Sequence, residues 1–251
     1  MNGYADRAIL VTGGAGFIGS HLVEELIRRG GRVTVVDDFS SGRLEHLATV
    51  KDQIRAHRLD LSTDDLRPLL SEQTYDFIFH LAGHASVPAS VQHPRQDLET
   101  NGLATFNLLE SVLNLAPRAR LLFASRAAVY GEGNAQPFRE EDPTVPVAPY
   151  GVSKLAAERY MNVFARVYGL HTASLRLFPI FGPRLRAHVV YDLMLKILNN
   201  PHELLIQGDG TQVRDFTYVT NAVKAFLLVA EQAALQGDVY NLGPGNRFQS
   251  A

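Results

Sequence analysis

Apolar runs of strand length alternate with amphipathic segments through the first two thirds of the chain. Between these runs, apolar residues such as Ile18, Leu22 and Leu26 recur with the spacing of one helix face. Alternating strands and helices favour a parallel, doubly wound α/β sheet covered on both faces. Six runs predict strands, at residues 7–12, 32–37, 54–60, 75–82, 119–125 and 171–178.

The alternation weakens after about residue 179. There, "VVYDLMLKILNN" predicts a helix, "ELLIQGDGTQVRDF" a strand–turn–strand, and a further helix opens near Thr220 before a last strand at "YNLG". The polar, proline-containing segment 131–149 predicts a long loop, and loops of this length are usually functional. We expect residues 1–178 to form one domain and 179–251 a small, C-terminally incomplete lobe, with 215–243 returning to the sheet.

Composition narrows the possible classes of protein. The 251 residues are 46% hydrophobic, enough for a full core in one or two domains. The net charge of −2 indicates no basic surface for nucleic acid or an anionic membrane. No cysteine is present, which excludes disulfides, thiolate nucleophiles and cysteine metal sites. The first residues resemble neither a signal peptide nor a membrane span, so we expect a cytoplasmic protein.

A glycine motif follows the first predicted strand. In "TGGAGFIGSH", Gly13, Gly16 and Gly19 recur at every third position where a helix begins. Glycine permits the tight turn and the close approach of backbone amides to a pyrophosphate, which the positive end of the helix also attracts. Asp37 ends the second strand, where a carboxylate binds the adenosine ribose and repels a 2′-phosphate. The sequence therefore predicts a Rossmann fold that binds NAD rather than NADP.

Two further strand ends border the same crevice. "LAG", which is Leu81, Ala82 and Gly83, ends the fourth strand, and Asp60 ends the third. Asp60 is either an adenine contact or a solvent-exposed turn acid.

A candidate catalytic pair opens a helix after the long loop. "PYGVSK" places Tyr150 and Lys154 four residues apart, so both project from one face. An ammonium group near a phenol favours the phenolate, so Lys154 is expected to lower the pKa of Tyr150 and make it a usable base. Lys154 is also suited to hold the cofactor ribose.

Together, "TGGAGFIGSHL", "VVDDFSSG", "HLAGHASVPASVQHP", "AAVYGE", "PYGVSKLAAE", "LRLFPIFGPR" and "GDGTQVRDFTYV" resemble the extended short-chain dehydrogenases/reductases of the NAD-dependent sugar epimerase/dehydratase family. The resemblance runs from residue 7 to about 243. It implies a nucleotide-diphosphate sugar as substrate, with UDP as the expected nucleotide. It also implies a homodimer formed through helices around 103–115 and 153–167.

The resemblance carries over residue by residue. Tyr150 matches the base that removes a proton from a sugar hydroxyl, and Lys154 its partner. Arg214 matches a residue aimed at the nucleotide diphosphate, with a surface ion pair to Asp215 or Asp209 as the alternative. Arg184 and Ser86 are weaker substrate candidates, and Ser86 serves equally well as a helix cap. Cofactor positions are matched by Gly13, Gly16, Phe17, Ile18, Gly19, Asp37, Asp60, Leu61, Leu81, Ala82 and Asn101.

The residues before "VYG" distinguish chemistries within this family. Dehydratases resemble one another in a Thr-Asp-Glu run there, and decarboxylating members carry a glutamate beside the valine. Here Ala127 and Ala128 hold no carboxylate, which resembles the 4-epimerases. In those enzymes a 4-keto sugar rotates and takes the hydride back on its other face, so NAD is regenerated.

Arg126 departs from the family pattern, because a serine or threonine normally stands four residues before Tyr130. Three hypotheses follow. Arg126 pairs with a negative substrate group such as a uronate carboxylate; Ser125 takes over the hydroxyl's role; or the catalytic site is impaired. The alternation of side chains along a strand argues against both residues facing inward.

Pro179 is a second departure, since relatives carry a polar asparagine or threonine there to contact the nucleotide sugar. The leading hypothesis is a 4-epimerase, and the alternatives are a non-catalytic binder of NAD and a sugar nucleotide, or a dehydratase. No metal site is expected, because His80 and His84 lie at a strand exit without an evident third ligand.

Overall fold

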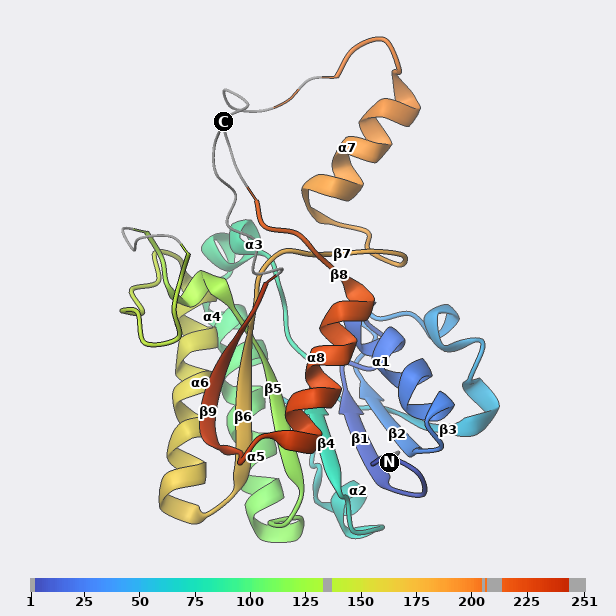
Figure 1. Cartoon of the computed structure of the whole chain (residues 1–251), viewed down its shortest axis with the longest axis vertical. Coiled ribbons are helices and arrows are strands. Elements are labelled where there is room, and N and C mark those ends of the chain that lie inside the picture. Colours follow the sequence, from blue (N-terminus) through green and yellow to red (C-terminus); the bar gives the residue numbers. More distant parts are fainter. Residues whose placement is uncertain (1–2, 133–136, 205, 207–213, 244–251) are drawn as a thin grey trace.

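A seven-stranded, fully parallel sheet forms the centre of the molecule (Figure 1). The computed structural model describes residues 3–132, 137–204, 206 and 214–243. The strand order is β3-β2-β1-β4-β5-β6-β9, so the order reverses between β1 and β4. The predicted doubly wound α/β sheet is confirmed. The strands are β1 (Ala8–Thr12), β2 (Arg32–Asp37), β3 (Ile54–Arg58), β4 (Phe77–His80), β5 (Arg120–Arg126), β6 (His171–Leu177) and β9 (Gln236–Leu242).

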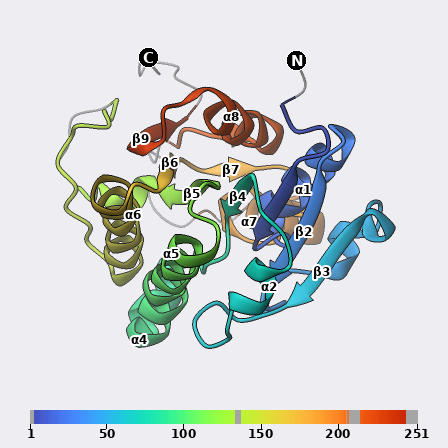
Figure 2. The ribbon, with the colours of Figure 1, turned by 90° about the horizontal axis from the view of Figure 1, so that it is seen from below.

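Helices cover both faces of the sheet (Figure 2). Helices α1 (Phe17–Arg28) and α8 (Val219–Gln232) pack on one face, and α2 (Arg67–Ser71), α5 (Ala104–Leu115) and α6 (Pro149–Tyr168) on the other. Each strand feeds both cores, because its side chains alternate between faces. In β1, Ile9 and Val11 face α1, whereas Ala8 and Leu10 face α5. All five residues of β1 are buried, as expected for a central parallel strand.

The segment after residue 178 forms a small two-stranded sheet and also adds the last strand to the main sheet. A short parallel pair, β7 (Ile180–Phe181) with β8 (Thr217–Tyr218), leads into α8, and β9 then pairs with β6 in the main sheet. Residues 219–242 therefore pack on the same sheet as the first 178 residues. The strand–turn–strand predicted for "ELLIQGDGTQVRDF" lies mainly outside the described residues. The division after residue 178 stays a prediction.

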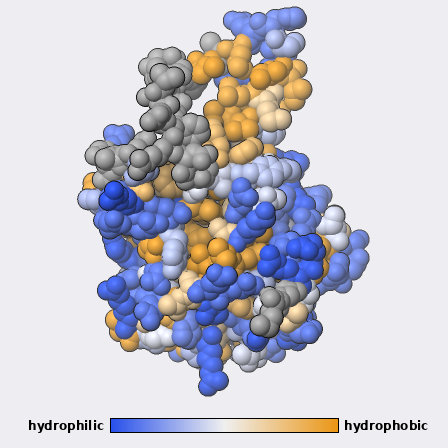
Figure 3. All heavy atoms as spheres, in the orientation of Figure 1, coloured by the Kyte–Doolittle hydropathy of each residue, from blue (hydrophilic) through white to orange (hydrophobic). Residues whose placement is uncertain are grey.

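Helix α7 (His188–Asn199) stands away from the sheet, and apolar side chains gather over it on the surface (Figures 1 and 3). None of its residues is buried, and Met194 and Leu198 are among its exposed apolar side chains. The remaining helices are α3 (Val87–Gln92), α4 (Pro94–Asp97), the π-helix Leu98–Leu103 and the 3₁₀ turns Leu44–Leu47, Lys51–Gln53 and Ala127–Val129.

Candidate active site

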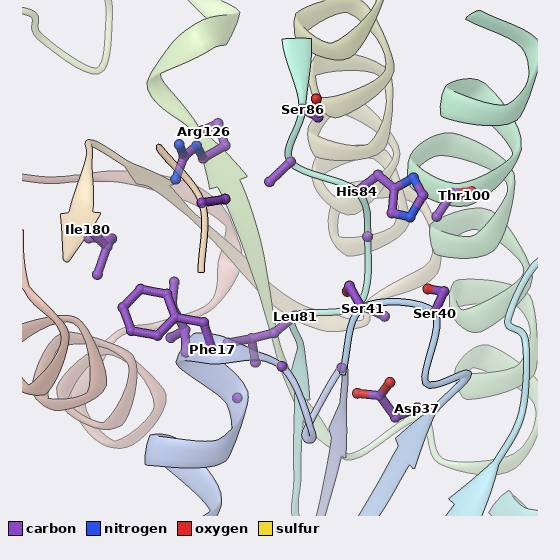
Figure 4. Close-up of a pocket in the computed structure, with 18 of the residues that line it drawn as sticks. Phe17, Asp37, Ser40, Ser41, Leu81, His84, Ser86, Thr100, Arg126 and Ile180 are labelled. Atoms are coloured by element: carbon purple, nitrogen blue, oxygen red, sulfur yellow. The ribbon is translucent and has the colours of Figure 1, made fainter. Parts of the chain in front are cut away.

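A cleft of about 1000 Å³ opens at the carboxyl ends of the strands (Figure 4). It lies where the strand order reverses between β1 and β4, the position at which open α/β sheets bind ligands. Its walls come from the start of α1, the ends of β2, β4 and β5, and the loop that leads into α7. In Figure 4, Asp37 marks one end of the cleft and Arg126 the other.

The glycine motif forms the floor of the cleft. Gly13 has φ +68°, and a Cβ there would lie 2.6 Å from the backbone nitrogen of Ala82. A Cβ on Gly19 would collide with the carbonyl oxygen of Gly13. Gly16 is the N-cap of α1, and no side chain caps this helix end. Turn, strand end and helix therefore approach closely, and the uncapped helix N-terminus fits a pyrophosphate.

Asp37 ends β2 as a buried carboxylate that borders the cleft. The backbone N–H groups of Ala15 and Phe39 each donate to it over 2.9 Å. Burial raises the pKa of Asp37, and these two N–H donors oppose that effect. Two oxygens held by one donor each retain lone pairs for ribose hydroxyls. The local geometry therefore fits the ribose-binding role expected for Asp37.

The loop after β4 approaches the catalytic helix closely. Gly83 has φ +145°, and a Cβ there would lie 2.5 Å from Asn101 Oδ1 and 2.9 Å from Lys154 Nζ. Asn101 Oδ1 is buried without a hydrogen-bond partner in the described structure. Leu81, Ala82 and Gly83 border the cleft, as do Phe17, Ile18 and Leu61.

Asp60 also borders the cleft, but it is exposed and forms a local turn. Its Oδ1 accepts from the backbone nitrogen of Ser62 over 2.8 Å and from its hydroxyl over 2.6 Å. The turn-acid and cleft interpretations of Asp60 are therefore compatible.

Tyr150 and Lys154 lie one turn apart at the start of α6, and both are buried. The Tyr150 hydroxyl has no hydrogen-bond partner in the described structure, although it borders the cleft. The Lys154 ammonium donates to the carbonyl oxygen of Ala124 over 3.3 Å and lies 4.8 Å from the ring centre of Phe123. Because buried hydroxyls are normally paired, the Tyr150 hydroxyl is placed for a partner supplied by a bound molecule.

The electrostatics of this pair involve a further cation, Arg126. Burial raises the pKa of Tyr150, and Arg126, rather than Lys154, is the cation that lowers it in part. Burial also lowers the pKa of Lys154 to about 7, with a further contribution from Arg126, while Asp97 acts in the opposite direction. Burial thus opposes the charged form of both groups, and the charge of Arg126 acts on both of them.

A buried network supports the pair from behind. Asp97 accepts a hydrogen bond from Ser153 Oγ over 2.6 Å and another from Asn101 Nδ2 over 3.0 Å. The network fixes Asn101 with its oxygen unpaired beside Gly83. Sequence analysis missed Asp97, although its position four residues before Asn101 is a helical spacing.

His80 belongs to a second buried network and not to a metal site. Thr105 Oγ1 donates to the carbonyl of Asn101 over 2.7 Å, so it accepts from His80 Nε2 over 2.9 Å, and Thr12 Oγ1 then donates to Nδ1 over 2.7 Å. Burial lowers the pKa of His80 to about 3, so the ring is neutral. Among the described residues, no group of three or more candidate ligands is placed to bind a metal.

Arg126 and Ser125 face opposite sides of β5. Arg126 is partly buried, borders the cleft, and makes neither a hydrogen bond nor an ion pair within the described part of the chain. Ser125 is fully buried, and its hydroxyl donates to Glu158 Oε2 over 2.8 Å. The hypothesis that Ser125 replaces the usual cleft hydroxyl is wrong, because strand alternation turns it toward α6.

Glu158 and Arg176 form a buried ion pair beneath the site. Their side chains are 1% and 3% exposed, and Arg176 Nη2 lies 2.6 Å from Glu158 Oε1. Arg176 also donates to the Tyr130 hydroxyl over 2.7 Å. The ion pair connects α6 to β6, and through Arg176 it also connects α6 to Tyr130. Its only sequence signal was an arginine within the apolar strand "HTASLRLF".

The expected substrate residues separate into two groups. Pro179, Ser86 and Arg184 border the cleft, whereas Arg214 is exposed and is not one of the described residues that line it. Ser86 caps α3, since its Oγ accepts from the backbone nitrogen of Ala89 over 3.2 Å. Arg184 makes a 2.6 Å ion pair with Glu24 of α1. Arg184 thus anchors the loop before α7 to the cofactor half.

Sequence analysis missed several residues that line the cleft. Ser40, Ser41 and Arg43 follow Asp37 in "DDFSSGR", so their nearness to the second strand end was the available signal. Four further polar residues come from α7, the loop before it and the π-helix, and only tertiary structure brings them to the cleft: Thr100, Arg186, His188 and Asp192.

Comparisons with known proteins agree with this geometry. Residues 9–243 match the model of the NAD dependent epimerase/dehydratase family. The chain is 36% identical over 241 residues to the UDP-glucose 4-epimerase of Mycolicibacterium smegmatis, covering 94% of this chain and 77% of that one. It resembles the structure of the UDP-N-acetylglucosamine 4-epimerase from Methanobrevibacter ruminantium in complex with UDP-N-acetylmuramic acid, with TM-score 0.89, 37% identity, and coverage of 96% and 78%. For the Thermus thermophilus UDP-glucose 4-epimerase in complex with NAD, the TM-score is 0.84, the identity 35%, and the coverage 95% and 78%.

The chain belongs to the NAD-dependent epimerase/dehydratase family, and its cofactor is NAD. The Gly13–Gly19 turn, the Asp37 carboxylate and the unpaired Tyr150 hydroxyl fit that cofactor in position and chemistry. No helix in the described ranges combines the length and apolar character needed to cross a membrane.

Proposed function

We propose that the protein interconverts C4 epimers of a nucleotide-diphosphate sugar, with UDP as the nucleotide. The observation that carries this proposal is the buried, unpaired Tyr150 hydroxyl at the cleft, on the helix turn before Lys154. A phenol in that position suits proton exchange with a sugar hydroxyl.

Tyr150 accepts the proton of the sugar O4 hydroxyl and later returns it. NAD, when bound, would supply a reversible hydride acceptor for C4, so no net oxidant would be consumed. The charge of Arg126 favours the phenolate form of Tyr150 against the effect of burial. Lys154, buried behind the cleft residue Gly83, would hold a ribose hydroxyl of the cofactor. The 4-keto sugar turns over in the pocket before the hydride returns, which inverts C4.

The side chains at the end of β5 favour epimerisation over dehydration. Ala127 and Ala128 line the cleft there and supply no acid or base for eliminating water. Asp192 of α7 is the one acidic residue that lines the cleft near Arg126; the other described acids of the cleft, Asp37, Asp38 and Asp60, follow β2 and β3. A non-catalytic binder of NAD and a sugar nucleotide is the rival proposal, motivated by Arg126 and Pro179.

We further propose that the protein is a homodimer through α5 and α6. Both helices expose apolar side chains away from the sheet, and such a patch is typical of a subunit interface. The exposed residues are Leu103 just before α5, Leu115 at its end, and Val152, Tyr160, Val163 and Val167 of α6.

Product analysis of purified protein with NAD and UDP-glucose, UDP-galactose or UDP-glucuronate tests the epimerase proposal. We expect the C4 epimer to form, and Tyr150→Phe to reduce the rate by about 100- to 10,000-fold while NAD still binds. The matched control is Tyr75→Phe, because the Tyr75 hydroxyl is also buried without a hydrogen-bond partner in the described structure but does not line the cleft. A 4-keto-6-deoxy product would overturn the proposal in favour of a dehydratase, and NAD binding without turnover would favour the binder.

A further inference from the structure

We propose that Arg126 binds a carboxylate carried by the sugar, so that the substrate is an acidic sugar nucleotide. This inference rests on the proposed function, and it names the substrate class for the same cleft.

The first observation is that Arg126 lacks a partner. It is partly buried, yet neither a hydrogen bond nor an ion pair to it exists among the described residues. Arg184, in the same cleft, is held by Glu24, and Arg176, below it, is held by Glu158. A partly buried guanidinium without an anion is costly, and arginine stays charged. The missing partner is therefore an anion that binds in the cleft.

The second observation is the charge around Arg126. Its charge lowers the pKa of Tyr150, of Lys154 and of His188 at the start of α7. Arg126 thus acts on both the β5–α6 wall and the α7 wall. Asp192, which lies one turn after His188 and raises its pKa, is the acid on the α7 wall. Asp192 makes no ion pair with Arg126 in the described structure, so the arginine stays available to a ligand.

The third observation is position. Arg126 ends β5 at the opposite end of the cleft from Asp37 (Figure 4). The neighbouring Ala127 and Ala128 are small and leave its guanidinium room in the cleft. The Tyr150 phenol, on which the charge of Arg126 acts, marks C4 of the bound sugar. In a hexuronate the carboxylate carbon is attached to C5, next to C4, whereas the diphosphate is attached to C1 across the ring. A cation beside the phenol is therefore placed for the carboxylate rather than the diphosphate.

The chemistry matches this position. A guanidinium binds a carboxylate through two parallel N–H···O bonds, which a hydroxymethyl group does not offer. A neutral hexose leaves Arg126 unpaired, as in the protein alone. Hydrogen bonds between charged groups of this kind correspond to a preference of about 10- to 100-fold for the acidic sugar.

Calorimetric titration of the NAD-loaded protein with UDP-glucuronate, UDP-glucose and UDP tests the inference. We expect UDP-glucuronate to bind about 10- to 100-fold more tightly than UDP-glucose. Arg126→Gln is expected to abolish that difference without changing UDP affinity, and Arg126→Lys to retain part of it. The matched control is Arg95→Gln, because the Arg95 side chain is 90% exposed and lies outside the cleft. NAD affinity and thermal unfolding verify that each variant is folded.

Three results would overturn the inference. If the unaltered protein binds UDP-glucose and UDP-glucuronate with equal affinity, Arg126 does not recognise a sugar carboxylate, while the proposed epimerase activity still stands. If Arg126→Gln loses affinity equally for UDP and for both UDP-sugars, Arg126 contacts the diphosphate and not the sugar. Failure of the unaltered protein to bind any UDP-sugar, with NAD still bound, overturns the proposed function together with the inference.

Discussion

Substitution of the buried Glu158–Arg176 ion pair tests how helix α6, which carries Tyr150 and Lys154, is held against the sheet. In Glu158→Gln, Arg176 keeps its charge in a site where it is 3% exposed, and Ser125 loses its charged acceptor. In Arg176→Met, the Glu158 carboxylate is left without its cation, and Tyr130 loses a donor. Each change therefore leaves an uncompensated group in the interior rather than merely removing an attraction.

Breaking one side of a buried pair costs about 3–5 kcal/mol of unfolding free energy. At about 2–4 °C per kcal/mol for a chain of this size, the melting temperature should fall by about 6–20 °C. The double variant Glu158→Gln/Arg176→Met removes both charges, so it should lose less than the sum of the two single variants.

Urea unfolding and thermal unfolding monitored by circular dichroism, each with and without NAD, measure these values. The matched control is the surface pair of Arg7 with Asp76, whose side chains are 56% and 32% exposed and whose ion pair is 2.8 Å long. Arg7→Met should cost about 0–1 kcal/mol. Losses below about 1 kcal/mol in both buried single variants, or strictly additive effects in the double variant, would refute the reasoning.

Two further predictions concern the cofactor half. Asp37→Ala should weaken NAD binding by about 10- to 100-fold in a fluorescence titration, because the ribose loses charge-assisted acceptors, and it should reduce the ratio of NAD affinity to NADP affinity. The control Asp65→Ala removes an exposed carboxylate outside the cleft and should change neither affinity. Unchanged NAD affinity of Asp37→Ala would contradict the assignment of Asp37 to the ribose. Because burial lowers the pKa of Lys154 from 10.5 to about 7, the unfolded state binds the extra proton between these values, so stability without NAD should rise with pH across that window. In urea unfolding, Lys154→Met should have a higher unfolding free energy than the unaltered protein near pH 7, and this difference should disappear toward pH 10. A difference that stays constant with pH would show that Lys154 does not titrate in this window.

The strands and the cofactor motif follow from short-range pattern. The central strands β1 (AILVT) and β4 (FIFH) are almost entirely apolar, and burial on both faces of a parallel sheet favours that composition. The turn at Gly13 and the carboxylate of Asp37 could be predicted because both sit directly at strand ends, where the chain's direction is set by a few residues. The spacing of Tyr150 and Lys154 likewise predicted that they share a helix face.

The charge states and the far wall of the cleft could not be predicted in this way. The sequence indicates that Lys154 lies near Tyr150, but it reveals neither the burial that lowers the pKa of Lys154 nor the effect of the Arg126 charge on the phenol. Nor does it place His188 and Asp192, which reach the cleft from a helix distant in the chain.

By itself, then, the sequence determined the doubly wound sheet, the NAD-binding turn and the placing of Tyr150 and Lys154 on one helix face, because each depends on neighbours within a few positions. Only the tertiary structure decided that Ser125 turns to Glu158 while Arg126 faces the cleft without a partner. The physical reason is that desolvation and ion pairing depend on which distant segments surround a side chain, and that is set by the packing of the whole chain.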